Sequence, residues 1–124
     1  MNSKIIMIIR IIFALALLFF GLNKVLHFID PPPAPESAWG YWEALTASKT
    51  MVLVAIVETL AGLSLLINKY KPLMMLILMS VSVNAVLYHL TMDPKSVVMA
   101  LVLLVLNIVM LYDNKDSYEA LLKG

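Results

Sequence analysis

Residues 50–67, TMVLVAIVETLAGLSLLI, decide how this chain folds. The stretch is apolar apart from two threonines, one serine and Glu58, which lies close to its middle. A helix needs about 20 apolar residues to cross the hydrocarbon core of a bilayer, and this stretch is close to that length. An ionisable side chain at the bilayer centre costs about 2.5–3.5 kcal/mol on insertion scales. We therefore expect Glu58 to face other helices or a small polar cavity, and to have a polar partner.

The rest of the chain repeats this apolar character. Of its 124 residues, 62% are hydrophobic and 14% are charged, whereas soluble domains carry about 45–50% apolar and about 25% charged residues. The apolar residues fall in four segments, at residues 5–28, 50–67, 73–90 and 96–112. We predict an all-α integral membrane protein, a single domain over residues 1–124, in which four transmembrane helices form an antiparallel bundle.

The connection at residues 30–49 is the longest one. It begins with prolines at 31, 32, 33 and 35, which favour an extended backbone. The part that follows contains Trp39 and Trp42 at helical spacing, and aromatic side chains favour the membrane–water interface. We predict a short amphipathic helix lying in the interface of this first outer loop. It could serve as a membrane anchor or as a lid over the outer mouth of the bundle.

Basic residues predict the orientation of the bundle. Cytoplasmic sides of membrane proteins carry an excess of lysine and arginine. If the N-terminus is inside, six of the nine basic residues are cytoplasmic, namely Lys4, Arg10, Lys69, Lys71, Lys115 and Lys123. The other three, Lys24, Lys49 and Lys95, are outside. We therefore predict a multi-pass protein with both termini in the cytoplasm.

Composition also excludes several classes of function. A net charge of +1 argues against nucleic-acid binding, which needs a basic face. The chain has no cysteine, so it has no disulfide, no thiol redox chemistry and no thiolate metal ligand. His27 and His89 lie at the outer rim, but a metal site would need further donors that the sequence does not supply. No metal site and no covalent cofactor are predicted.

Polar residues inside the apolar segments predict where a site lies. At 1.5 Å per residue, Lys24, Asn84 and Glu58 lie about 6, 9 and 12 Å below the outer surface. At these depths the three side chains are within reach of one another. We therefore predict a ligand-binding site in the outer half of the bundle, formed by Lys24, Glu58, Asn84, His27 and Tyr88. A second interpretation is a structural charge network, formed by Arg10, Lys24, Glu58 and Asn107. Arg10 could instead extend to the inner headgroups, and the sequence leaves open whether Lys24 or Arg10 pairs with Glu58.

The charged residues and the glycines near them resemble a known family. Arg10 early in the first segment, Gly21-Leu-Asn-Lys24 near its end, and Glu58-Thr-Leu-Ala-Gly62 in the second are similar to the DoxX family of small four-helix membrane proteins. The resemblance implies an integral bundle in the bacterial cytoplasmic (inner) membrane, with Arg10, Lys24 and Glu58 as its charged residues. Family members are associated with quinone-reducing thiosulfate oxidation or with redox-stress proteins, and a distant animal branch assists receptor assembly.

Two hypotheses follow, and neither gives the chain a catalytic residue. In the first, the bundle binds a quinone or similar membrane amphiphile and is an accessory subunit of a membrane oxidoreductase, because the chain has no redox centre of its own. In the second, it is an assembly factor or structural subunit whose buried charges hold its helices in register. The partners expected are membrane lipid and a membrane protein or a second copy of the chain.

Overall fold

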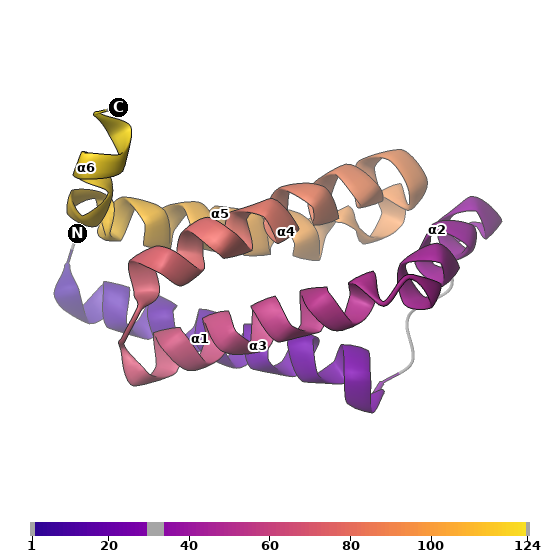
Figure 1. Ribbon diagram of the computed structural model, residues 1–124, viewed down its shortest axis with the longest axis horizontal. Helices are drawn as coiled ribbons and strands as arrows, with labels where there is room; N and C mark the ends of the chain where they lie inside the picture. The colour runs from indigo at the N-terminus through magenta and orange to yellow at the C-terminus, as the bar shows by residue number, and fades with distance from the viewer. Residues whose placement is uncertain (1, 30–33, 124) are drawn as a thin grey trace.

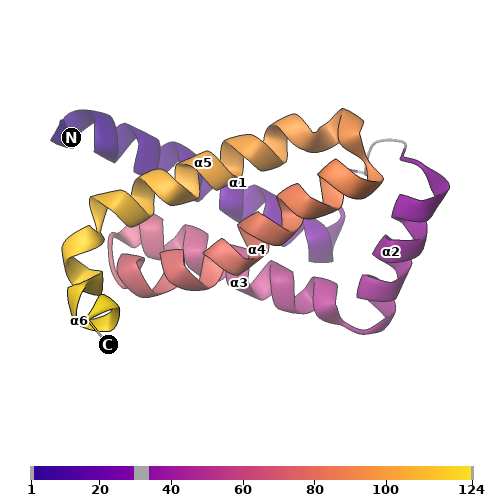
Figure 2. The same ribbon diagram turned by 90° about the horizontal axis from the view of Figure 1, so that it is seen from above.

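The fold is a bundle of four long helices that alternate in direction (Figure 1). The computed structural model describes residues 2–29 and 34–123. The long helices are α1 (Ser3–Leu26), α3 (Thr50–Ile67), α4 (Lys71–Met92) and α5 (Val97–Asp113). Helices α1 and α3 form one layer, and α4 and α5 lie over them when the bundle is seen from above (Figure 2). Each long helix, α5 together with the short η1 (Pro94–Ser96) before it, has the length and apolar character needed to cross a membrane. The predicted four-helix membrane bundle is confirmed.

The helix ends differ from the predicted segments by a few residues. The second segment was predicted at 50–67 and α3 has these same bounds. The first was expected to reach residue 28, but α1 ends at Leu26 because His27 adopts a left-handed backbone, with φ of 55°. The third segment, predicted at 73–90, extends at both ends into α4, and Pro72 lies in its first turn, where a missing N–H costs nothing.

A short helix also forms in the first long connection. Helix α2 (Glu36–Ala47) lies across the end of the bundle that is opposite the start of α1 (Figure 1). Within α2, the Ala38 side chain is fully buried, and the side chains of Trp39 and Trp42 are half-buried. Its place in a membrane interface stays a prediction. Three of the four prolines expected to favour an extended backbone, those at 31, 32 and 33, lie outside the described residues.

The core is small and lies along the middle of the bundle. Side chains from all four long helices meet there, while most other large apolar side chains face outward. Outward-facing apolar side chains are expected where the surrounding solvent is hydrocarbon. The buried core side chains are Phe13, Ala14, Leu17, Ala61, Leu65, Met75, Leu78 and Met110.

The chain ends in a compact turn beyond α5. It consists of η2 (Lys115–Tyr118) and α6 (Glu119–Leu122). Tyr118 is buried and its hydroxyl donates a hydrogen bond to the Pro72 carbonyl at 2.8 Å. Burial raises the pKa of the Tyr118 phenol, which keeps that donor proton in place. The turn is thereby fastened to the start of α4.

Candidate functional site: a buried ion pair between two helices

Glu58 has a partner, and that partner is Lys24. The Nζ atom of Lys24 on α1 lies 2.6 Å from Oε1 of Glu58 on α3. Six per cent of the Glu58 side chain is exposed, against 20% of the Lys24 side chain. Lys24 also lies 3.4 Å from the Phe20 carbonyl, which accepts a hydrogen bond from it. Within residues 2–29 and 34–123, no other hydrogen-bond donor reaches Oε1 of Glu58.

Two glycines let α1 and α3 approach closely enough to form this pair. A Cβ atom at Gly62 would lie 2.9 Å from the Ala14 carbonyl oxygen, and one at Gly21 would lie 3.0 Å from the Thr59 nitrogen. No side chain larger than hydrogen fits these positions without a shift of the backbone. Small residues at such contacts are what allows membrane helices to pack tightly. Lys24 lies one turn beyond Gly21, and Glu58 one turn before Gly62, so the glycine contacts hold the pair in register.

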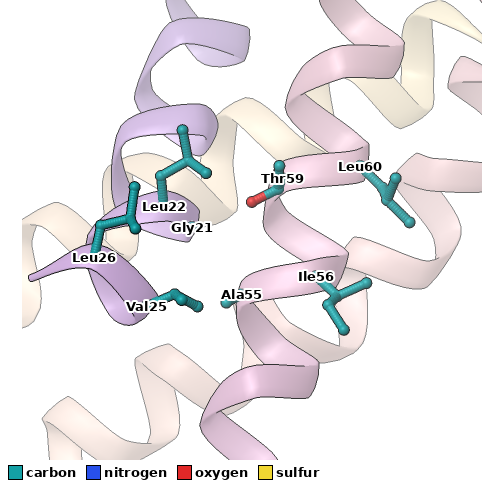
Figure 3. Close-up of a pocket in the computed structure, with 8 residues that line it drawn as sticks. All are labelled: Gly21, Leu22, Val25, Leu26, Ala55, Ile56, Thr59 and Leu60. Carbon is teal, nitrogen blue, oxygen red and sulfur yellow. The ribbon is translucent and has the colours of Figure 1, made fainter.

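An apolar groove flanks the same contact between α1 and α3 (Figure 3). It has a volume of about 290 Å³ and no polar surface. Neither Lys24 nor Glu58 lines it, so the groove and the ion pair occupy different flanks of the helix contact. The lining residues are Gly21, Leu22, Val25 and Leu26 of α1, and Ala55, Ile56, Thr59 and Leu60 of α3.

Arg10 is not near the ion pair. Its guanidinium donates a hydrogen bond to the carbonyl of Leu65, in the last turn of α3. The last four carbonyls of a helix lack partners within it, and a cation there also opposes the helix dipole. Arg10 therefore caps the C-terminal end of α3. The sequence analysis considered two other roles for it, extension to the inner headgroups and pairing with Glu58.

Replacing Arg10 with methionine is expected to lower the free energy of unfolding by about 1 kcal/mol, because one charge-assisted hydrogen bond to Leu65 is lost. Denaturant unfolding in mixed micelles, followed by circular dichroism, measures this change. Lys4→Met removes a charge from the exposed first turn of the same helix and serves as the control. Equal stability of the two variants would show that the Arg10 contact contributes nothing.

Asn107 is also separate from the charged residues. It is fully buried between α5 and α4. Its Nδ2 donates to the Met75 carbonyl at 3.1 Å, and its Oδ1 accepts from the Ser82 hydroxyl at 2.8 Å. Both functional groups of the amide are thus satisfied by one neighbouring helix. This is an interhelical clamp, and no hydrogen bond in the described residues joins it to Glu58.

Asn84 and Tyr88 of the predicted ligand site meet α2 rather than the ion pair. Asn84 Nδ2 lies 3.4 Å from the hydroxyl of Tyr41, to which it donates. The rings of Tyr41 and Tyr88 are stacked, with centroids 5.2 Å apart and an interplanar angle of 22°. These contacts attach α2 to α4. Tyr41 had no role in the sequence analysis, although its place between Trp39 and Trp42 was a signal that the helix carries an aromatic face.

The two histidines, both expected at the outer rim, have different surroundings and no contact partner in common. His27 is exposed at the end of α1. His89 packs against Tyr88, and its Nδ1 lies 3.8 Å from Oδ2 of Asp93, too far for a hydrogen bond. Asp93 is buried and was not a predicted site residue. No three acidic or histidine side chains in the described ranges gather closely enough to hold a metal ion.

Fold and site together define a multi-pass membrane protein, a four-helix bundle with an ion pair buried between its first and second membrane helices. The sequence model of the DoxX family matches residues 5–91, from α1 into α4. The match covers more than half of the chain and includes both Lys24 and Glu58, and the chain belongs to the DoxX family. No curated protein and no solved structure matches it.

Proposed function

We propose that the Lys24–Glu58 pair binds the polar head of an isoprenoid quinone or a similar membrane amphiphile. The protein then acts as an accessory component of a redox system in the bacterial cytoplasmic membrane. Electrons come from a separate membrane protein, because this chain has no redox centre of its own. Its own contribution is to hold the head and to exchange a proton with it.

The observation that carries this proposal is the incomplete hydrogen bonding of a buried charge. Glu58 is almost fully enclosed, yet the Lys24 ammonium is its one partner among the described residues. Ionisable groups within membrane helices are expensive and commonly serve ligand or proton pathways. A purely structural carboxylate would be expected to have its remaining lone pairs satisfied by additional donors.

The chemistry of the pair suits a quinone head. Lys24 keeps a fifth of its side chain exposed, so the ammonium can donate a hydrogen bond to an incoming carbonyl oxygen. When the reduced ligand takes a proton from Lys24, Glu58, 2.6 Å from the same nitrogen, can accept a proton from water and pass it to Lys24.

Mass spectrometry of the organic extract tests this proposal. Protein purified in mild detergent is expected to retain about one quinone or other amphiphile per chain, and Glu58→Gln is expected to reduce that occupancy at least about tenfold. The reason is that the neutral amide no longer holds the ammonium in place, and a lost charged hydrogen bond has an effect of this size. Size-exclusion elution and circular dichroism establish that the variant is folded.

Glu43→Gln makes the same chemical change on the exposed face of α2 and should leave the occupancy unchanged. Retention of ligand by Glu58→Gln would remove the pair from the binding site. An extract with no stoichiometric amphiphile from the wild-type protein would instead favour the assembly hypothesis. The next measurement is then capture of a stoichiometric membrane-protein partner.

A further inference from the structure

A second cavity lies at the end of the bundle that carries α2. It has a volume of about 500 Å³ and lies between the start of α2 and the turn from α4 into η1. This is one of the two ends where the membrane-spanning helices stop, so it lies at the level of lipid headgroups. Pockets of about 300–1,000 Å³ hold small molecules. The lining residues are Ala34, Pro35, Asp93, Pro94 and Lys95.

Asp93 gives this cavity a buried negative charge. Six per cent of its side chain is exposed, and the described residues supply it with no side-chain hydrogen bond. The nearest basic atom, Nδ1 of His89, is 3.8 Å from Oδ2 and is itself buried without a hydrogen-bond partner in the described ranges. A carboxylate that is mostly buried and lacks a hydrogen-bond donor is costly to the fold. A donor that enters the cavity and reaches the Asp93 carboxylate would remove that cost.

Lys95 gives the same cavity an exposed positive charge. It is two residues from Asp93, and no acidic side chain in the described parts of the chain lies within ion-pair distance of its ammonium. Among the described residues, one cavity thus presents a carboxylate that lacks a hydrogen-bond donor in its wall and an ammonium without an ion pair at its edge. That arrangement is complementary to a zwitterion, with its cation inside and its anion outside.

We propose that this cavity binds the phosphoethanolamine headgroup of a membrane phospholipid. The primary ammonium of the headgroup has three N–H donors, as a lysine side chain has. It donates to the carboxylate of Asp93, which lines the cavity, whereas its phosphate accepts from Lys95. The exposed apolar side chains of Leu90 and Val98 lie on the helices next to the cavity, where the acyl chains can follow them.

The choice of ethanolamine over choline follows from hydrogen bonding. A choline head has the same charge but carries three methyl groups on its nitrogen, so it has no N–H to donate. It would leave the Asp93 carboxylate without a hydrogen-bond donor and would keep the cationic nitrogen farther from it. The proposal therefore requires discrimination between two lipids that share a phosphate and can share their acyl chains.

Native mass spectrometry of the full chain in detergent tests this. Dioleoyl phosphatidylethanolamine and dioleoyl phosphatidylcholine are titrated separately. The ethanolamine lipid is expected to bind at least about tenfold more tightly, and Asp93→Asn is expected to remove this difference. Lys95→Gln should weaken both lipids by a similar factor, because both present a phosphate. Asp113→Asn, an exposed aspartate at the end of α5, is the matched control and should change neither affinity.

Equal binding of the two lipids by the wild-type protein would overturn the proposal, and so would a preference for ethanolamine that survives in Asp93→Asn. Binding of free phosphoethanolamine as tight as that of the phospholipid would show that the ligand is not a lipid. If Asp93→Asn does not fold, Asp93→Glu retains the charge and must retain the preference. Glu58→Gln should leave lipid binding intact, which separates this inference from the proposed quinone site.

Discussion

Lys24→Met is expected to destabilise the bundle by about 3 kcal/mol. Removing one member of a buried ion pair leaves the other charge uncompensated, and this typically costs about 3–5 kcal/mol. We expect the lower end of that range because Glu58 can take up a proton when its partner is lost. Unfolding of the purified protein in mixed micelles, with increasing denaturing detergent, measures the change in the free energy of unfolding.

The double variant Lys24→Met/Glu58→Gln separates the pair from its surroundings. With both charges gone, no buried charge is left uncompensated and only a neutral amide lacks a partner, so part of the lost stability should return. Glu58→Gln alone should cost less than Lys24→Met, since one fifth of the Lys24 side chain is exposed and its ammonium can turn toward water. A coupling energy of about 2 kcal/mol is expected from the cycle. Lys49→Met, at an exposed lysine before α3, is the control, and if Lys24→Met costs no more than this control, the pair does not contribute to stability.

The membrane helices could be predicted because their ends are marked in the sequence. The second of them is the clearest case, since Lys49 precedes its apolar run and Asn68-Lys69 follows it, and α3 has the predicted bounds. Leu26 ends α1 earlier than expected. There, the apolar residues continue past the helix end, and the left-handed turn at His27 has no hydropathy signal.

The partners of the polar residues could be predicted only in part. Depth along the helix axis can be counted from sequence, and it placed Lys24 and Glu58 within reach of each other. The direction in which a side chain points depends on how each helix is rotated against its neighbours. Asn107 has the depth of an inner-half residue, but it faces α4, where Ser82 and the Met75 carbonyl satisfy it.

The contact between α2 and the bundle could not be predicted from the sequence, for a different reason. A connection of this length can be placed in many ways, and periodicity fixes its helix but not its docking. The Asn84 amide and the Tyr88 ring that we assigned to the ligand site contact Tyr41 instead. The proposed quinone site is accordingly smaller than the sequence suggested, and it rests on Lys24 and Glu58.

The second large effect is expected at Gly62. In an ordinary helix, replacing glycine with alanine stabilises by about 0.5–1 kcal/mol, because alanine loses less backbone entropy on folding. At Gly62 the added Cβ would lie 2.8 Å from Cγ of Leu18 and 2.9 Å from the Ala14 carbonyl oxygen. The leucine side chain can move, but the carbonyl belongs to the backbone of α1, so the two helices must separate. We expect Gly62→Ala to lower the free energy of unfolding by about 2 kcal/mol, and Gly62→Leu by more.

Gly40 supplies the matched comparison. It lies within α2, and a Cβ there would meet nothing within 4 Å. Gly40→Ala should therefore raise stability slightly, so the same substitution is expected to have opposite signs at the two positions. Gly21→Ala should cost less than Gly62→Ala, because its shortest contact, 2.6 Å, is to the Thr59 hydroxyl, which can rotate away. Separation of α1 from α3 would also lengthen the distance between Lys24 and Glu58, so Gly62→Ala should reduce amphiphile retention although it alters neither charge. A Gly62→Ala protein as stable as Gly40→Ala would mean that close packing of α1 on α3 does not hold the ion pair together.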